Sequence, residues 1–72
     1  MDRAPIVVHR PLGTGGRRVT AGAQVLGLAH SDRDLVEFLR QAGIDETTAE
    51  DMVAGDSQLI EWRGGDAHRY AA

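Results

Sequence analysis

The sequence predicts a small α+β domain: a small antiparallel sheet, made of three N-terminal strands and a C-terminal hairpin, with a two-helix hairpin packed on one face. Short apolar runs punctuated by glycine fill residues 5–29, two amphipathic segments follow at 32–42 and 45–54, and strand-like segments flank a Gly-Gly pair at 64–65. Strands and helices segregated in this way are typical of α+β domains. The 72 residues are enough for one such domain, 1–72.

Residues 5–29 have the pattern of three short strands. The first, "PIVVHRP", ends at Pro11 and is followed by "LGTGG", a glycine-rich turn. "RRVTA" at 17–21 and "QVLGLA" at 24–29 predict two further strands around Gly22. Gly27 interrupts the last of these strands, which predicts either a bulge or close packing at that position.

Capping signals bound the first helix. Ser31 and Asp34 form a capping box, in which the serine oxygen accepts from the amide of Asp34. Apolar residues then recur at i, i+3, i+4 and i+7 within 35–42, which makes one apolar stripe. Gly43 ends the helix in a left-handed conformation, so we expect a Schellman ending in which Ile44 folds back on the helix.

The second helix is shorter, and two starts are open. Asp45 suits an N-cap position, and Thr47 with Glu50 forms a second capping box. Its apolar stripe is narrow and Gly55 ends it. A helix of this length is marginal in isolation, so packing on the first helix or on the sheet must stabilise it.

The C-terminal stretch "QLIEWRGGDAHRYAA" predicts a hairpin around Gly64 and Gly65, which suit the positive φ angles of a two-residue turn. The register of that hairpin pairs Glu61 with His68. Directly opposed residues share a face, and the core face is expected to hold Ile60, Trp62 and Ala67. The outer face is expected to hold Leu59, Glu61, Arg63, Asp66, His68 and Tyr70.

The sequence offers little for catalysis or metal binding. It has no cysteine, which excludes disulfides and thiolate metal sites, and its three histidines are 21 and 38 positions apart, unlike the close spacing of zinc ligands. Glu61 and His68 are an acid–base alternative, but such pairs are more often weak surface contacts. We therefore expect no enzyme activity, no catalytic residue, no cofactor and no metal.

Charge is segregated along the chain. Its formal net charge of -3 combines four arginines against one acid in residues 1–30 with nine acids against two arginines in residues 31–61. Opposed charged surfaces favour association with a complementary partner. We expect a small non-catalytic binding or regulatory module that acts through protein–protein contact, with a protein partner or with itself. The candidate contact residues are Glu37, Asp45, Glu46, Glu50, Asp51, Arg10, Arg17 and Arg18.

The alternative is a nucleic-acid accessory protein with a winged-helix-like arrangement. A helix pair followed by a hairpin has that order, and the N-terminal arginine cluster could contact phosphate. The second helix, "DETTAEDMVAG", is acidic throughout, so it is unsuited to reading DNA, whose affinity comes mainly from basic contacts. The arginine cluster consists of Arg3, Arg10, Arg17 and Arg18, with Arg63 and Arg69 as further members.

The N-terminal stretch "MDRAPIVVHRP" is unlike a signal peptide, and no apolar run is long enough to cross a bilayer. We therefore expect a cytoplasmic protein with no membrane partner. The stretch "LGLAHSDRDLVEFLRQAGI", followed by "EWRGGDAHRY", resembles short proteins of unknown function encoded in high-GC bacteria. That resemblance covers most of the chain, and it implies a shared fold but no site residue.

Overall fold

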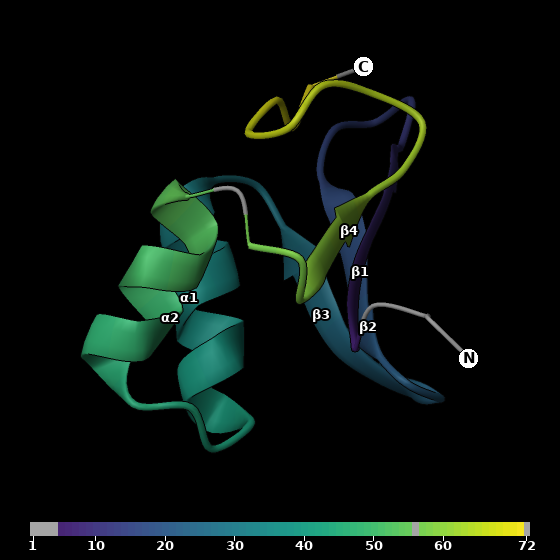
Figure 1. Cartoon of the computed structure of the whole chain (residues 1–72). Helices are drawn as coiled ribbons and strands as arrows, with labels where there is room; N and C mark the ends of the chain where they lie inside the picture. The colour runs from purple at the N-terminus through teal and green to yellow at the C-terminus, as the bar shows by residue number, and fades with distance from the viewer. Residues whose placement is uncertain (1–4, 56, 72) are drawn as a thin grey trace.

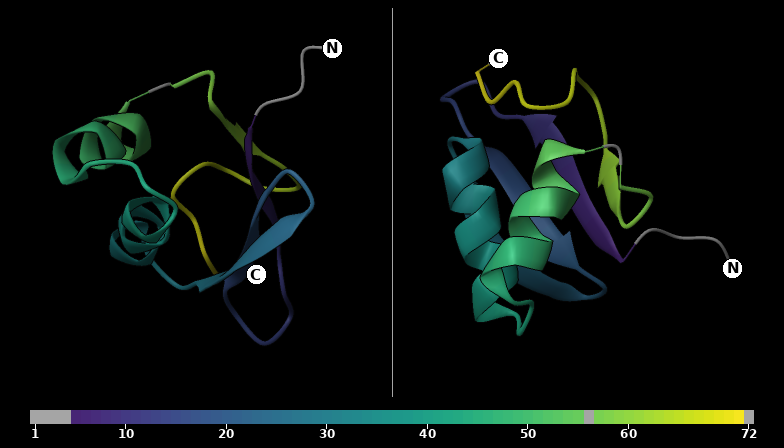
Figure 2. Two further views of the ribbon diagram at one scale, coloured as in Figure 1. Left: turned by 90° about the horizontal axis from the view of Figure 1, so that it is seen from below. Right: turned by 60° about the vertical axis from the view of Figure 1, so that its left-hand side comes forward.

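The structure, a computed structural model, describes residues 5–55 and 57–71 and confirms the α+β class. Both helices lie on one face of a single four-stranded sheet (Figures 1 and 2). Three strands and the two helices occupy the segments that the sequence pattern predicts. The elements are β1 (Ile6–Pro11), β2 (Arg17–Ala21), β3 (Gln24–Ala29), α1 (Asp32–Gln41), α2 (Glu46–Ala54) and β4 (Ile60–Trp62).

The strand order is β3-β2-β1-β4, and β4 corrects the prediction of a C-terminal hairpin. The pairs β1–β2 and β2–β3 are antiparallel, but β4 runs parallel to β1, with Ile60 opposite Ile6 and Trp62 opposite Val8. The chain passes through α1 and α2 between β3 and β4, and this crossover returns it to the sheet in the direction of β1. The sheet is therefore mixed rather than antiparallel.

Residues 63–71, here called the C-terminal segment, contain no strand in the described structure. The second half of the predicted hairpin is therefore absent from the described residues, and with it the wing of a winged-helix-like arrangement. Ala67, expected in the core, is exposed, whereas Tyr70, expected on the outer face, is buried with 8% of its surface exposed. The predicted burial of Ile60 is confirmed.

The helix ends are as predicted. The Ser31 hydroxyl accepts from the amide of Asp34 at 3.3 Å, and the Asp34 carboxylate accepts from the amide of His30 at 2.9 Å. At the other end of α1, Gly43 has φ +105°, and the Ile44 amide donates to a carbonyl of the last turn, which is the Schellman pattern. Asp45, not Thr47, is the N-cap of α2.

The core lies between the sheet and the helices. Val8 and Val19 of the sheet and Leu35 and Leu39 of α1 have no exposed surface. Gly27 proves to be both a bulge and a close contact, because the β2–β3 register skips Leu26 and a Cβ at Gly27 would lie 2.6 Å from the Phe38 ring. The apolar periodicity of β1, β2 and α1 thus translates directly into this layer of contacts.

Candidate functional site

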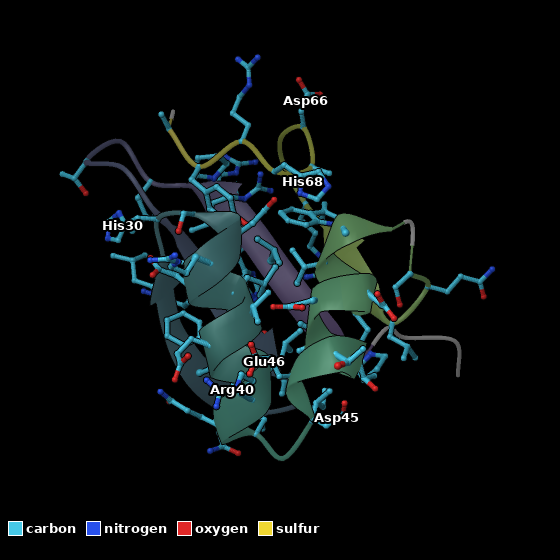
Figure 3. The ribbon with its side chains drawn as sticks, turned by 90° about the vertical axis from the view of Figure 1, so that its left-hand side faces the viewer. His30, Arg40, Asp45, Glu46, Asp66 and His68 are labelled. Atoms are coloured by element: carbon cyan, nitrogen blue, oxygen red, sulfur yellow. The ribbon has the colours of Figure 1, made fainter. Side chains whose placement is uncertain are left out.

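The predicted acidic contact residues lie on the outer surface of the helix pair, and all of them are exposed. Figure 3 shows this surface, with Arg40, Asp45 and Glu46 labelled. The apolar stripes of α1 and α2 face each other and the sheet, so the acidic side chains project to solvent. The acidic helix surface consists of Glu37, Asp45, Glu46, Glu50 and Asp51.

A groove of about 450 Å³ runs between α1 and α2 on this surface and brings three of the five acids together: Glu37, Glu46 and Glu50. Arg40 lies among them and donates to Glu37 at 2.9 Å, with its Nε 3.9 Å from Glu46. These contacts are exposed and contribute little to stability. The structure does not bring Asp45 and Asp51 into the lining of the groove.

Asp45 has a structural role at the start of α2. Its carboxylate accepts from the hydroxyl of Thr48 at 2.7 Å and from the Thr48 amide at 3.2 Å. These hydrogen bonds favour the ionised form, so they lower the pKa of Asp45. The carboxylate charge is thereby maintained at the N-terminus of the helix, where the helix dipole also favours it.

The arginine cluster is not one surface. Arg10 and Arg18 are exposed as predicted, and Arg3 lies outside the described residues. Arg17, predicted to contact a partner, has no exposed surface, which corrects that prediction. Alternation along "RRVTA" places Arg17 on the same side of β2 as the buried Val19, so it faces the interior.

The guanidinium of Arg17 holds the C-terminal segment against the sheet. Its Nε donates to the carbonyl of His9 at 2.7 Å, and its Nη2 to the carbonyl of Arg63 at 2.6 Å. Its Nη1 donates to the carbonyls of Asp66 at 2.9 Å and Arg69 at 2.8 Å. Three of these four acceptors belong to the C-terminal segment, so they are not free for a hairpin ladder. In the C-terminal segment the Arg17 side chain thus supplies hydrogen bonds that the predicted hairpin would have drawn from a second strand.

A second polar cluster joins the same segment to the start of α1. Asp32 lies 2.8 Å from His68 Nδ1 and accepts from the Tyr70 hydroxyl at 2.6 Å. The rings of His68 and Tyr70 also pack against Trp62, with centroids at 5.0 and 6.2 Å. Burial, followed by the hydrogen bond to Asp32, raises the pKa of Tyr70.

The predicted pairing of Glu61 with His68 is wrong. Glu61 instead binds Arg63 at 2.5 Å, two residues away on the same side of the extended chain. His68 has a left-handed φ of +69°, which turns its ring toward Asp32. An oriented imidazole is a component of acid–base sites, but none of the cavities described in this structure lies at the His68 ring.

Neither a cluster of metal ligands nor a membrane-spanning helix occurs among the described residues. Within the described residues, no group of three or more His, Asp or Glu side chains is placed to hold a metal ion. The described helices are also too short or too polar to traverse a bilayer.

The predicted contact residues thus divide into exposed acids on the helix pair and arginines of which Arg17 is buried. The acidic helix surface is exposed and continuous with a groove, whereas the buried arginine and the Asp32 cluster serve the C-terminal segment. No protein-family model, no curated protein and no solved structure matches the chain.

Proposed function

We propose that this chain is a small non-catalytic binding module that contacts a protein partner through the acidic helix surface. The observation that carries the proposal is the gathering of five exposed acids on one helix pair, accompanied there by two arginines, Arg33 and Arg40. Such a surface attracts a partner that presents Lys or Arg side chains.

The charges on this surface are not all internally compensated. Glu37 and Glu46 share Arg40, whereas Glu50 and Asp51 form no ion pair with a described residue. A basic partner can therefore add ion pairs at Glu50 and Asp51 without first breaking an existing one. Because all these groups are exposed, the attraction is screened over a Debye length of about 10 Å at 0.1 M salt.

The test compares the tagged chain with the double variant Glu46→Lys, Glu50→Lys in capture from lysate of the native host. We expect proteins retained by the parent chain to be lost from the variant and to be released by salt. Capture is repeated with nuclease, because a true protein partner survives that treatment. A control variant, Thr14→Lys with Gln58→Lys, adds two exposed lysines away from the acidic helix surface. Equal capture by both variants and the parent would refute the proposal.

One observation favours a second candidate, binding to nucleic-acid phosphate. Arg10 packs directly on Gly64, which brings it beside the exposed Arg63 and Arg69 at the C-terminal segment. Arg63 is paired with Glu61, and Arg69 lies 4.0 Å from Asp66, so phosphate would compete with these carboxylates for two of the three cations. Affinity from such contacts falls steeply with salt. A gel shift at low salt, with duplex and single-stranded DNA of random sequence, tests this candidate. No shift at tens of micromolar protein would eliminate it.

A further inference from the structure

The two edges of the sheet differ in how well they are protected against pairing with another strand. β4 has three residues, includes Glu61 and leads into Arg63, and short charged strands are a common protection of sheet edges. β3 forms the opposite edge with the six residues "QVLGLA", which include no charge and no proline. It is the one strand among the four that lacks a charged residue. Natural proteins rarely leave such an edge unpaired.

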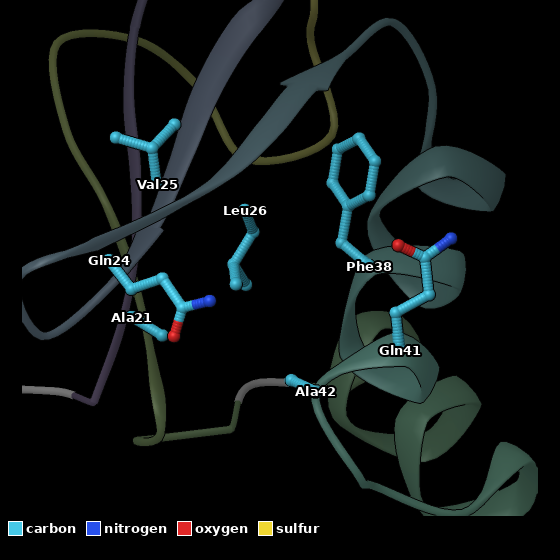
Figure 4. A pocket seen from close by; sticks show the side chains of 7 residues that line it. All are labelled: Ala21, Gln24, Val25, Leu26, Phe38, Gln41 and Ala42. Carbon is cyan, nitrogen blue, oxygen red and sulfur yellow. The ribbon is translucent and has the colours of Figure 1, made fainter.

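The surroundings of this edge are uncharged as well. A groove of about 490 Å³ between β3 and α1 is lined by Ala21, Gln24, Val25, Leu26, Phe38, Gln41 and Ala42 (Figure 4). The interhelical groove, by contrast, has five charged residues among its six lining residues. In a chain with 26% charged residues, this neutral stretch stands apart. The partner that best suits this uncharged edge is therefore another uncharged, extended strand.

The helix-free face of β3 has exposed apolar side chains. Val25 lies opposite Thr20, and Leu28 opposite Arg18, so both project to the face without helices. Val25 is 60% exposed and Leu28 40% exposed. Val25 and Leu26 project to opposite sides of the ribbon in Figure 4, as the alternation of a strand requires.

We propose that β3 pairs antiparallel with β3 of a second copy of this chain, which joins the two four-stranded sheets into one. An uncharged strand of the required kind is present in the chain itself, and a twofold axis perpendicular to the sheet aligns a strand with its own copy in antiparallel orientation. Pairing satisfies the backbone groups on the free edge. It also brings Val25 and Leu28 of one copy beside those of the other, away from the acidic helix surface.

The bulge at Leu26 limits the length of this contact. One extra residue of β3 is accommodated between Val19 and Thr20 of β2, and a bulge twists the strand locally. The regular ladder therefore runs on either side of Leu26 and is short. We expect a weak, concentration-dependent dimer, stabilised mainly by backbone hydrogen bonds and by the apolar side chains on the helix-free face.

The test is the mass of the full chain in solution, measured by sedimentation velocity over a range of concentrations. The parent chain is expected to form a dimer. Val25→Lys places a charged side chain from each copy within the apolar contact on the helix-free face and is expected to raise the dissociation constant by about tenfold or more. Leu59→Lys is the matched control, because Leu59 is 49% exposed and lies at the start of β4. Unchanged fluorescence of Trp62, the one tryptophan, reports that each variant is folded.

Salt separates this proposal from the electrostatic one. A dimer through uncharged β3 is expected to persist at high salt and in the Glu46→Lys, Glu50→Lys variant, whereas contact through the acidic helix surface is lost in both. A parent chain that stays monomeric up to millimolar concentration would overturn the proposal. So would a dimer that Val25→Lys does not weaken.

Discussion

The β1–α2 region and the C-terminal segment are stabilised by different forces. In the first, apolar side chains fill the space between sheet and helices, and the backbone groups are satisfied within regular elements. In the second, residues 63–71 have no ladder, and the side chains of Arg17 and Asp32 provide much of their attachment. A small domain can therefore order a segment that lacks regular structure, provided that buried polar groups satisfy its backbone.

We therefore expect a substitution in the core to destabilise the whole domain, and a substitution of Arg17 to affect mainly the C-terminal segment. Leu39→Ala removes a fully buried side chain from α1 and is expected to cost about 2–5 kcal/mol of unfolding free energy. Loss of stability should be global, since Leu39 belongs to the single core. Urea unfolding, followed by circular dichroism, measures it. Leu59→Ala, at a position 49% exposed, is the control and should change stability by less than about 1 kcal/mol. Similar costs for the two would contradict the assignment of the core.

Arg17→Met tests whether the Arg17 guanidinium holds the C-terminal segment against the sheet. The variant keeps much of the aliphatic stem but removes the guanidinium donor from four carbonyls, of which that of Asp66 still accepts from the Arg69 amide. We therefore expect a loss on the order of 2–3 kcal/mol. Unlike the core variant, it should release residues 63–71 first, which hydrogen exchange by NMR detects as faster amide exchange in that segment. Arg18→Met, one residue away and exposed, is the matched control. Equal amide exchange of residues 63–71 in the two variants would refute this role of Arg17.

The attachment of the C-terminal segment is expected to depend on pH through Tyr70. Its pKa is raised above the usual value of about 10, because burial and Asp32 disfavour the phenolate. The stabilisation is therefore fully present below pH of about 10 and is lost as pH rises above it. Tyr70 is the one tyrosine, so tyrosinate absorbance reports it directly. We expect ionisation to coincide with detachment of the C-terminal segment, and Tyr70→Phe to remove this alkaline transition. Ionisation at the usual pKa in the intact fold would contradict the burial.

The smallest expected effect is at the cap of α2. The pKa of Asp45 is lowered by its bonds to Thr48, so the stability that it contributes is present above pH of about 4 and is lost as pH falls below that value. Asp45→Asn retains an N-cap acceptor without this titration. The helical circular dichroism of the parent, measured relative to that of the variant from about pH 5 to about pH 2, should fall toward acid, because only the parent loses a charge at this cap. A constant difference would show that the Asp45 charge does not matter.

Local pattern was sufficient for most of the fold. The short apolar runs of β1 to β3 with their glycine-containing turns, the stripe of α1 and the caps at Ser31, Gly43 and Asp45 depend on neighbours within a few residues, so the sequence by itself predicted them. The exposure of the five acids followed for the same reason, because they occupy the polar sides of amphipathic helices. The role proposed for those acids remains a prediction.

Only the tertiary structure decided the path of residues 60–71. The place of β4 in the sheet depends on which edge of β1 is free, and the path of residues 63–71 depends on Arg17, more than 45 residues earlier in the chain. The partner of His68 proved to be Asp32, 36 positions away, in place of the neighbour that a hairpin would supply. Contacts over such distances carry no periodicity, so turn-forming glycines alone favoured the wrong partner. The residues that make these long-range contacts come together only once the sheet and the helix pair have packed.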